Sequence, residues 1–182
     1  MRPLALFLLL VLMASPAEAL RLRDFSVAPY QDYLLLYAYV EDLPEADLKE
    51  AMRHGLGLSF TYEVEIKRLR RFLRDETLLA QEIVRTVYYD PVKNLYFVHT
   101  VGASAAPYRA PSFRQALALA SSLEGVPLLP LNRFEAGRRY RVSLRVRIRK
   151  FTRVSFPQRL LRVLLFRGET LESPWQSLVF TP

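Results

Sequence analysis

Residues 141–154 read RVSLRVRIRKFTRV, and the alternation within this stretch decides the fold. Every even position from Val142 to Ile148 is apolar, and every odd position from 141 to 149 is Arg or Ser. A repeat of two residues is typical of an extended strand, because successive side chains of a strand point to opposite faces. We therefore expect a long strand over residues 140–154 with one buried face. The other face carries a row of guanidinium groups, those of Arg141, Arg145, Arg147 and Arg149.

A second alternating stretch offers a partner for this strand. Apolar residues from Phe60 to Ile66 alternate with polar ones, which predicts another half-buried strand. Glu63 and Glu65 repeat at the same two-residue interval as the arginines, so pairing of the two strands would neutralise part of the row within the chain. The row is therefore interpreted first as an internal ion network. The alternative is a charged surface or strand edge that receives an acidic protein partner.

Other segments predict further strands with the spacing of hairpins, without the regular exchange of strand and helix that marks a parallel sheet. The expected strands are residues 33–40, which are apolar on both faces, 84–89 and 95–101, which form a hairpin, and 175–180.

Three segments carry the start and stop signals of short helices. They are residues 43–54, 112–124 and 155–167. The glycines expected to close them are Gly55, Gly125 and Gly168. Residues 127–138, which are punctuated by proline, are expected to form a connection. The elements together predict a mostly β (α+β) fold, an antiparallel β-sandwich-like single domain with two or three short helices.

Residues 1–19 have the layout of a cleavable signal peptide. Arg2 precedes an apolar run from Leu4 to Met13, and small residues stand at Ala17 and Ala19, the positions that the peptidase recognises. The apolar run is about half as long as the roughly 20 residues that span a bilayer. We therefore expect cleavage after Ala19 and an exported protein of the bacterial periplasm or cell envelope.

The remaining residues, 20–182, are enough for one domain with its own core. The chain has no cysteine, which excludes disulfides, thiolate metal sites and thiol nucleophiles. Its net charge is +8, and the basic C-terminal third, residues 138–167, holds eleven Lys or Arg and no acid. Such an asymmetry indicates an anionic neighbour. Export argues against nucleic acid as that neighbour.

The sequence contains none of the common motifs of hydrolytic, nucleotide-binding or metal chemistry. The two histidines, His54 and His99, have structural explanations, at a helix end and within a strand. Glu63, Glu65 and Asp90 are the strongest candidates for an acid–base pair, but ion pairing or turn capping explains each of them. We therefore predict that the protein is not an enzyme and has no catalytic residue, metal site or cofactor.

The expected helix over residues 158–167 (QRLLRVLLFR) gives a second interpretation of the basic third. Arg159 and Arg162 stand between its apolar residues. A basic helix with much apolar surface either docks on its own domain or lies on an anionic membrane surface. The alternative function is therefore a peripheral binder of anionic lipid or envelope polymer through Arg159 and Arg162.

Several features occur in a familiar order: GLSFTYEVEIKRLRRFLRDE at residues 57–76, the turn at Tyr89-Asp90 before Tyr96, and the late Trp175. Because these features occur in this order, the chain resembles an uncharacterised exported bacterial family, domain of unknown function 4390. The resemblance implies no activity. It does imply an envelope accessory protein, because members tend to be encoded beside sensor histidine kinases of the nitrogen-regulation type. The expected protein partner is therefore the sensor domain of such a membrane kinase.

Overall fold

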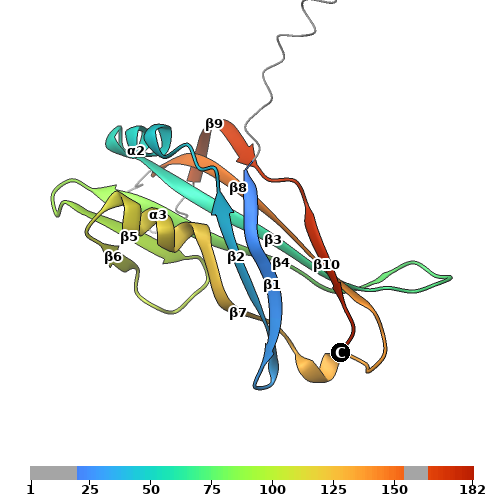
Figure 1. Cartoon of the computed structure of the whole chain (residues 1–182). Coiled ribbons are helices and arrows are strands. Elements are labelled where there is room, and N and C mark those ends of the chain that lie inside the picture. The colour runs from blue at the N-terminus through green and yellow to red at the C-terminus, as the bar shows by residue number, and fades with distance from the viewer. Residues whose placement is uncertain (1–19, 154–163) are drawn as a thin grey trace, which may run out of the picture.

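The computed structural model describes residues 20–153 and 164–182 (Figure 1). The predicted signal peptide, residues 1–19, lies outside the described residues, as do Arg159 and Arg162. Two antiparallel sheets face one another, and two α-helices pack on the larger sheet (Figure 1). The predicted mostly β fold is therefore confirmed, with the layering of a sandwich.

Ten strands, two α-helices and one 3-10 helix make up the described part of the chain. They are β1 (Arg21–Tyr30), β2 (Tyr33–Glu41), α2 (Glu45–Arg53), β3 (Leu56–Arg68), β4 (Glu76–Asp90), β5 (Leu95–Thr100), β6 (Tyr108–Ala110), α3 (Phe113–Ser121), β7 (Ser122–Pro130), η1 (Leu131–Arg133), β8 (Tyr140–Arg153), β9 (Leu164–Glu172) and β10 (Gln176–Phe180).

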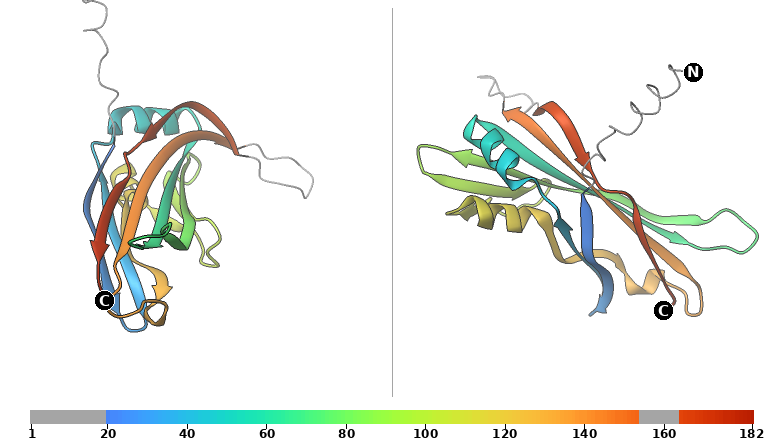
Figure 2. Two further views of the ribbon diagram at one scale, coloured as in Figure 1. Left: turned by 90° about the vertical axis from the view of Figure 1, so that its right-hand side faces the viewer. Right: turned by 45° about the horizontal axis from the view of Figure 1, so that its top comes forward.

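The small sheet has the order β1-β2-β7, and the large sheet has the order β10-β8-β3-β4-β5-β6. Strand β9 also pairs with β8, so β9 and β10 follow one another along the same edge of that strand. The β3–β4 hairpin continues beyond the other strands at one end of the molecule (Figure 2). Strands β3 and β8 are therefore the centre on which the rest of the large sheet is built.

The core lies between the two sheets, as the alternation of β3 and β8 predicts. The apolar residues from Phe60 to Ile66 of β3 and from Val142 to Ile148 of β8 are at most 1% exposed. They face Leu34, Leu36 and Ala38 of β2, which are also buried. Burial of a side chain of this size contributes about 1.5–3 kcal/mol, so these two strands hold the fold together.

The helix expected over residues 112–124 ends three residues earlier, at Ser121, because Ser122–Pro130 is strand β7. The cap of that helix is confirmed, since Ser112 Oγ accepts from Gln115 N at 3.3 Å. Beyond the helix, Leu123 is buried against the core and the backbone pairs with β2. Prolines that suggested a loop are tolerated here, because β7 lies at the edge of its sheet and one side of its backbone needs no partner.

The prediction of a helix over residues 155–167 is wrong for its last four residues, 164–167. Residues 154–163 lie outside the described residues, but β9 begins at Leu164 and runs through Gly168 to Glu172. Its partner is the end of β8, from Arg147 to Arg153. The physical reason is that this edge of β8 presents open backbone donors and acceptors, which a strand satisfies and a helix does not.

The structure contains one strand that was not predicted, β1, and one that is longer than predicted, β4. Strand β1 was not expected, and it pairs with β2 through a register shift after Arg23, where Asp24 has a φ of 52°. Strand β4 begins at Glu76, eight residues before the predicted start. The first helix is confirmed: Leu48, Ala51 and Met52 are buried, and Gly55 follows its end with a φ of 81°.

Helix α3 is fastened to the large sheet by the buried Tyr62 and the half-buried Arg85, which bind carbonyl groups at its end. Tyr62 Oη donates to the Ala120 carbonyl at 2.6 Å, and Arg85 Nη1 donates to the Leu119 carbonyl at 2.6 Å and to that of Ser122. Burial raises the pKa of Tyr62 well above its usual range, despite the opposing charge of Arg85, so the hydroxyl keeps its proton and remains a donor. These hydrogen bonds from Tyr62 and Arg85 satisfy carbonyl groups that have no hydrogen-bond donor within the helix at its C-terminal end.

Replacing Tyr62 by Phe is expected to lower the free energy of unfolding by about 1–2 kcal/mol, because the Ala120 carbonyl stays buried without this donor while the ring still fills its site. Urea denaturation of the two proteins measures the difference. The same exchange at Tyr33, which is 47% exposed, serves as control and changes stability by less than about 0.5 kcal/mol. Equal stability of Tyr62→Phe and the parent would show that the bond contributes nothing.

Candidate functional site

The predicted arginine row lies on the outer face of the large sheet, the side that points away from the small sheet. Alternation places Arg141, Arg145, Arg147 and Arg149 on the side opposite the buried residues of β8. Across the β3–β8 ladder, Glu63 lies opposite Arg145 and Thr61 lies opposite Arg147. The pairing expected from the shared repeat is thus the one that the chain adopts.

Glu63 binds two arginines of the row. Nε and Nη2 of Arg145 lie 3.2 and 2.5 Å from Oε2 of Glu63, and Nη2 of Arg147 contacts Oε1. The side chain of Glu63 is only 14% exposed, so the ion pairs are largely shielded from water. The expected partnership is confirmed for Glu63. Glu65 differs, because it pairs with Lys67 of its own strand at 2.5 Å.

Arg145 has two further partners that come from the last part of the chain. Its Nη1 donates to Oε1 of Glu172, and its Cζ lies 4.7 Å from the centroid of the Trp175 ring. A guanidinium over an indole face makes a favourable cation–π contact. Neither residue is predicted at the arginine row from the sequence, because both reach it only through the pairing of β9 and β10 with the edge of β8. The lone Trp of the chain was the one available signal.

Ser173 determines where Trp175 lies. Its backbone N–H donates to the Val146 carbonyl at 3.0 Å, and its Oγ accepts from Val146 N at 3.0 Å. Ser173 is 2% exposed, so these bonds are made away from water. They hold the chain against β8 at the break between β9 and β10. The indole two residues later is thereby fixed above Arg145.

The row ends at Arg141, whose Nη1 lies 3.5 Å from Oδ2 of Asp75. Arg149 lies on the same face, opposite Ser59 in the ladder. Arg141, Arg145 and Arg147 each have a carboxylate partner within the chain. The outer face is therefore a network of paired charges at these three positions rather than a bare positive surface.

Two exposed apolar side chains border this network. Trp175 is 42% exposed and Val179 is 46% exposed. Ser177 lies between them in sequence and shares a hydrogen bond of 2.8 Å with Ser143 of β8. We call Arg145, Glu63, Glu172, Trp175 and Val179 the outer-face cluster. It combines a half-exposed aromatic ring with an arginine that is held in place by carboxylates.

A second charge cluster ties the base of the β3–β4 hairpin. Arg68 donates from Nε and Nη2 to Oε2 of Glu76 at 3.1 and 2.5 Å, and from Nη1 to Glu135. Arg70 also donates to Glu76. The hydrogen bond from Arg68 is the main reason that the pKa of Glu76 is lower than usual, with that from Arg70 acting in the same direction against desolvation.

A titration of Glu76 followed by NMR at its side-chain carboxyl carbon is expected to have its midpoint below the ordinary value of 4.5. The interaction stabilises the folded chain at neutral pH, and this contribution is lost as the pH falls through the folded-state pKa. In Arg68→Gln the midpoint should move up toward 4.5. An unchanged midpoint in that variant would contradict the assigned cause.

Asp90, His54 and His99 were considered for catalysis, and the structure gives each of them a local structural explanation. Oδ1 of Asp90 accepts from the backbone N–H groups of Val92 and Lys93 at 3.0 and 3.1 Å, as expected of a turn cap. Nδ1 of His54 lies 2.9 Å from the Glu50 carbonyl at the end of α2, and His99 lies in β5 opposite Thr86. Among the described residues, no group of three His, Cys, Asp or Glu is placed to hold a metal ion.

A hollow of about 270 Å³ lies beside the end of α3, lined in part by Arg85, Thr100, Tyr108 and Glu124. The guanidinium of Arg85 is already bound to the carbonyl groups of Leu119 and Ser122. The hollow is therefore part of the packing around α3, and it is separate from the outer-face cluster.

The comparisons with known proteins give one match. A family model described as "Domain of unknown function (DUF4390)" matches residues 17–179. No curated protein and no solved structure matches the chain. Within residues 20–153 and 164–182, no helix is long and apolar enough to cross a membrane.

Proposed function

We propose that this chain, which belongs to the DUF4390 family, is a non-enzymatic exported binding domain. It engages a protein partner through its outer-face cluster. The proposed location is the bacterial periplasm or cell envelope, supported by the signal-peptide layout of residues 1–19. The proposed partner is the sensor domain of a membrane histidine kinase.

The contact between Arg145 and Trp175 carries the proposal. Trp and Arg are enriched among the residues that dominate binding energy at protein interfaces. Here the two side chains stack at 4.7 Å, and the guanidinium is also bound to Glu63 and Glu172. A side chain that is already ordered loses little conformational entropy when a partner covers it. The indole, at 42% exposed, offers apolar area that a partner can bury.

The paired charges change how the arginine row would take part in binding. The partner need not neutralise Arg141, Arg145 and Arg147, because Asp75 and Glu63 already balance them. Attraction between opposite charges is therefore a smaller contribution than the sequence suggested, and burial of Trp175 and Val179 a larger one. The proposed interface is centred on the aromatic ring, and Arg141 and Arg149, which lie on the same face, form its rim.

Binding to the sensor domain of the kinase encoded beside the gene tests this proposal. Replacing Trp175 by Ala is expected to weaken binding about 30-fold, as removal of a central aromatic residue typically does. Tyr33→Ala is the matched control, because Tyr33 is similarly exposed, at 47%, but lies on the small sheet. Isothermal titration calorimetry gives both dissociation constants.

Two results would oppose the proposal. Absence of binding by the parent protein would exclude this sensor domain as the partner. Equal binding by the parent and Trp175→Ala would remove the outer-face cluster as the contact surface.

A further inference from the structure

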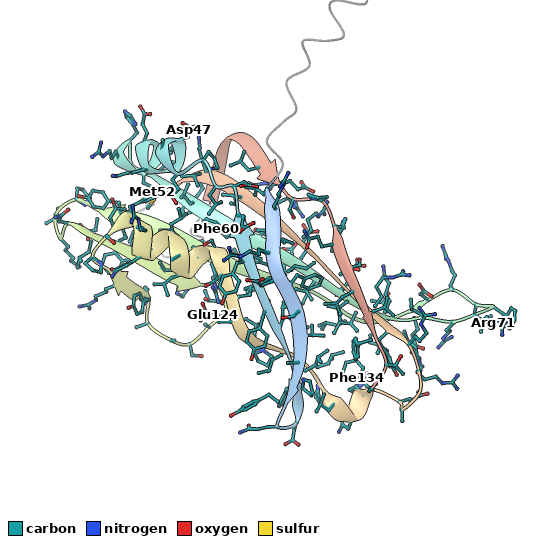
Figure 3. The ribbon with its side chains drawn as sticks, viewed as in Figure 1. Asp47, Met52, Phe60, Arg71, Glu124 and Phe134 are labelled. Carbon is teal, nitrogen blue, oxygen red and sulfur yellow. The ribbon has the colours of Figure 1, made fainter. Side chains whose placement is uncertain are left out.

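The β3–β4 hairpin ends in a segment that extends away from the body of the protein. This segment, Leu69 to Arg74, is here called the hairpin tip. Arg71, labelled in Figure 3, stands at its far end, beyond every other strand in this view. The tip can therefore meet a flat surface without interference from the two sheets.

Two neighbouring apolar side chains stand at the tip. Phe72 is 87% exposed and Leu73 is 70% exposed. Single exposed apolar residues are common on protein surfaces. Two large apolar side chains side by side at the end of a protruding hairpin instead indicate a surface that contacts a membrane or another molecule. Because both side chains are exposed, neither contributes to the hydrophobic core.

Arginines surround this apolar pair. Arg70, Arg71 and Arg74 belong to the tip, and Arg71 lies with its Cζ 5.2 Å from the centre of the Phe72 ring. Arg70 is bound to Glu76, whereas Arg71 and Arg74 make no ion pair with any carboxylate whose side chain the structure describes. The outer part of the tip is therefore positively charged as well as apolar.

The base of the hairpin holds the tip in place. Leu69 N donates to the Arg139 carbonyl at 2.8 Å, and Arg70 N donates to Oδ1 of Asp75 at 3.2 Å. Together with the ion pairs between Arg68 and Glu76, these bonds fix both strands where the tip begins. A contact made by the tip would therefore cost little additional ordering of the chain.

We propose that the hairpin tip docks on the surface of an anionic phospholipid bilayer. Phe72 and Leu73 enter the boundary between headgroups and acyl chains, and Arg71 and Arg74 meet the lipid phosphates.

The order of chemistry along the hairpin supports this choice of partner. Arg71 stands at the apex beside Phe72 and Leu73, and the carboxylates Asp75 and Glu76 stay at the base. The boundary layer of an anionic membrane likewise brings phosphate groups and hydrocarbon together, with water outside. Nucleic acid would satisfy the arginines alone, and a protein partner would need a pocket that fits a convex apex. This site is independent of the outer-face cluster.

Flotation with vesicles tests the proposal on the chain that remains after cleavage behind Ala19, using phosphatidylcholine with and without phosphatidylglycerol. Binding is expected only to the anionic vesicles. Arg71→Gln/Arg74→Gln is expected to weaken it about 25-fold, from roughly a fivefold loss for each charge at an anionic surface. Phe72→Ser/Leu73→Ser is expected to weaken it at least tenfold, about the effect of losing a buried apolar side chain. The control is Tyr30→Ser/Tyr33→Ser, an exposed pair at the β1–β2 turn, and it should bind like the parent.

A label at the tip reports on the contact itself. Because the chain has no cysteine, Phe72→Cys can be labelled at one position with an environment-sensitive NBD group. Its emission should rise and shift to shorter wavelength on anionic vesicles, while the same label at Val92→Cys, on the β4–β5 turn, should not respond. No binding to anionic vesicles, equal binding by the tip variants, or binding without a response at position 72 would each overturn the proposal. Preferential binding to DNA would overturn it as well.

Discussion

Replacing Glu63 by Gln is expected to lower the free energy of unfolding by about 3 kcal/mol, the lower end of the cost of breaking a buried ion pair. Glu63 is the carboxylate that lies between Arg145 and Arg147, and its side chain is 14% exposed. Without its charge, two shielded guanidinium groups face each other, and among the ion pairs of the described side chains Arg145 alone keeps another carboxylate, Glu172. Urea denaturation at neutral pH measures the change.

The matched control is Glu65→Gln, on the same strand and the same face. Glu65 is 34% exposed and pairs with Lys67, so its loss should cost less than about 1 kcal/mol, as for surface ion pairs. Adding Arg147→Gln to Glu63→Gln should restore part of the lost stability, because it removes one of the two like charges. A difference of less than about 1 kcal/mol between the two single variants would show that burial does not strengthen the pairs of Glu63.

Replacing Gly57 by Val is expected to destabilise the protein by about 3 kcal/mol, the upper end of the usual cost of overpacking. Valine favours strands, so propensity alone predicts the opposite sign. In the structure, Gly57 lies opposite Phe151 in the β3–β8 ladder, and a β-carbon there would come within 2.7 Å of Cε1 of that ring. Phe151 is 1% exposed, so its ring has little room to move.

Thermal unfolding followed by circular dichroism checks this result in two backgrounds. In the parent, Gly57→Val should lower the midpoint strongly. In Phe151→Ala, which is itself destabilised, the same exchange should have little further effect, because the ring that it meets is absent. Thr61→Val, on the same strand and face, serves as control and should be nearly neutral. Equal effects of Gly57→Val in the two backgrounds would exclude the proposed clash.

The candidate site can be predicted from the sequence only in part. Glu63 was expected beside the arginines because it shares their two-residue repeat, and the ladder places it opposite Arg145. Trp175 and Glu172 share no repeat with β8, and the pairing of β9 and β10 brings them there. The exposed pair at the hairpin tip was likewise hidden, because an apolar residue in a sequence does not show whether a neighbour covers it.

By itself the sequence determined the strands whose faces differ, β3 and β8, and with them the core and the side on which the arginines lie. Alternation is a local property, since each residue's face follows from its place in the strand. Only the tertiary structure decided that Ser122–Pro130 and Leu164–Glu172 are strands, contrary to their helix and loop signals. Those segments pair with edges of β2 and β8 that come from distant parts of the chain, and open backbone groups at an edge outweigh local propensity.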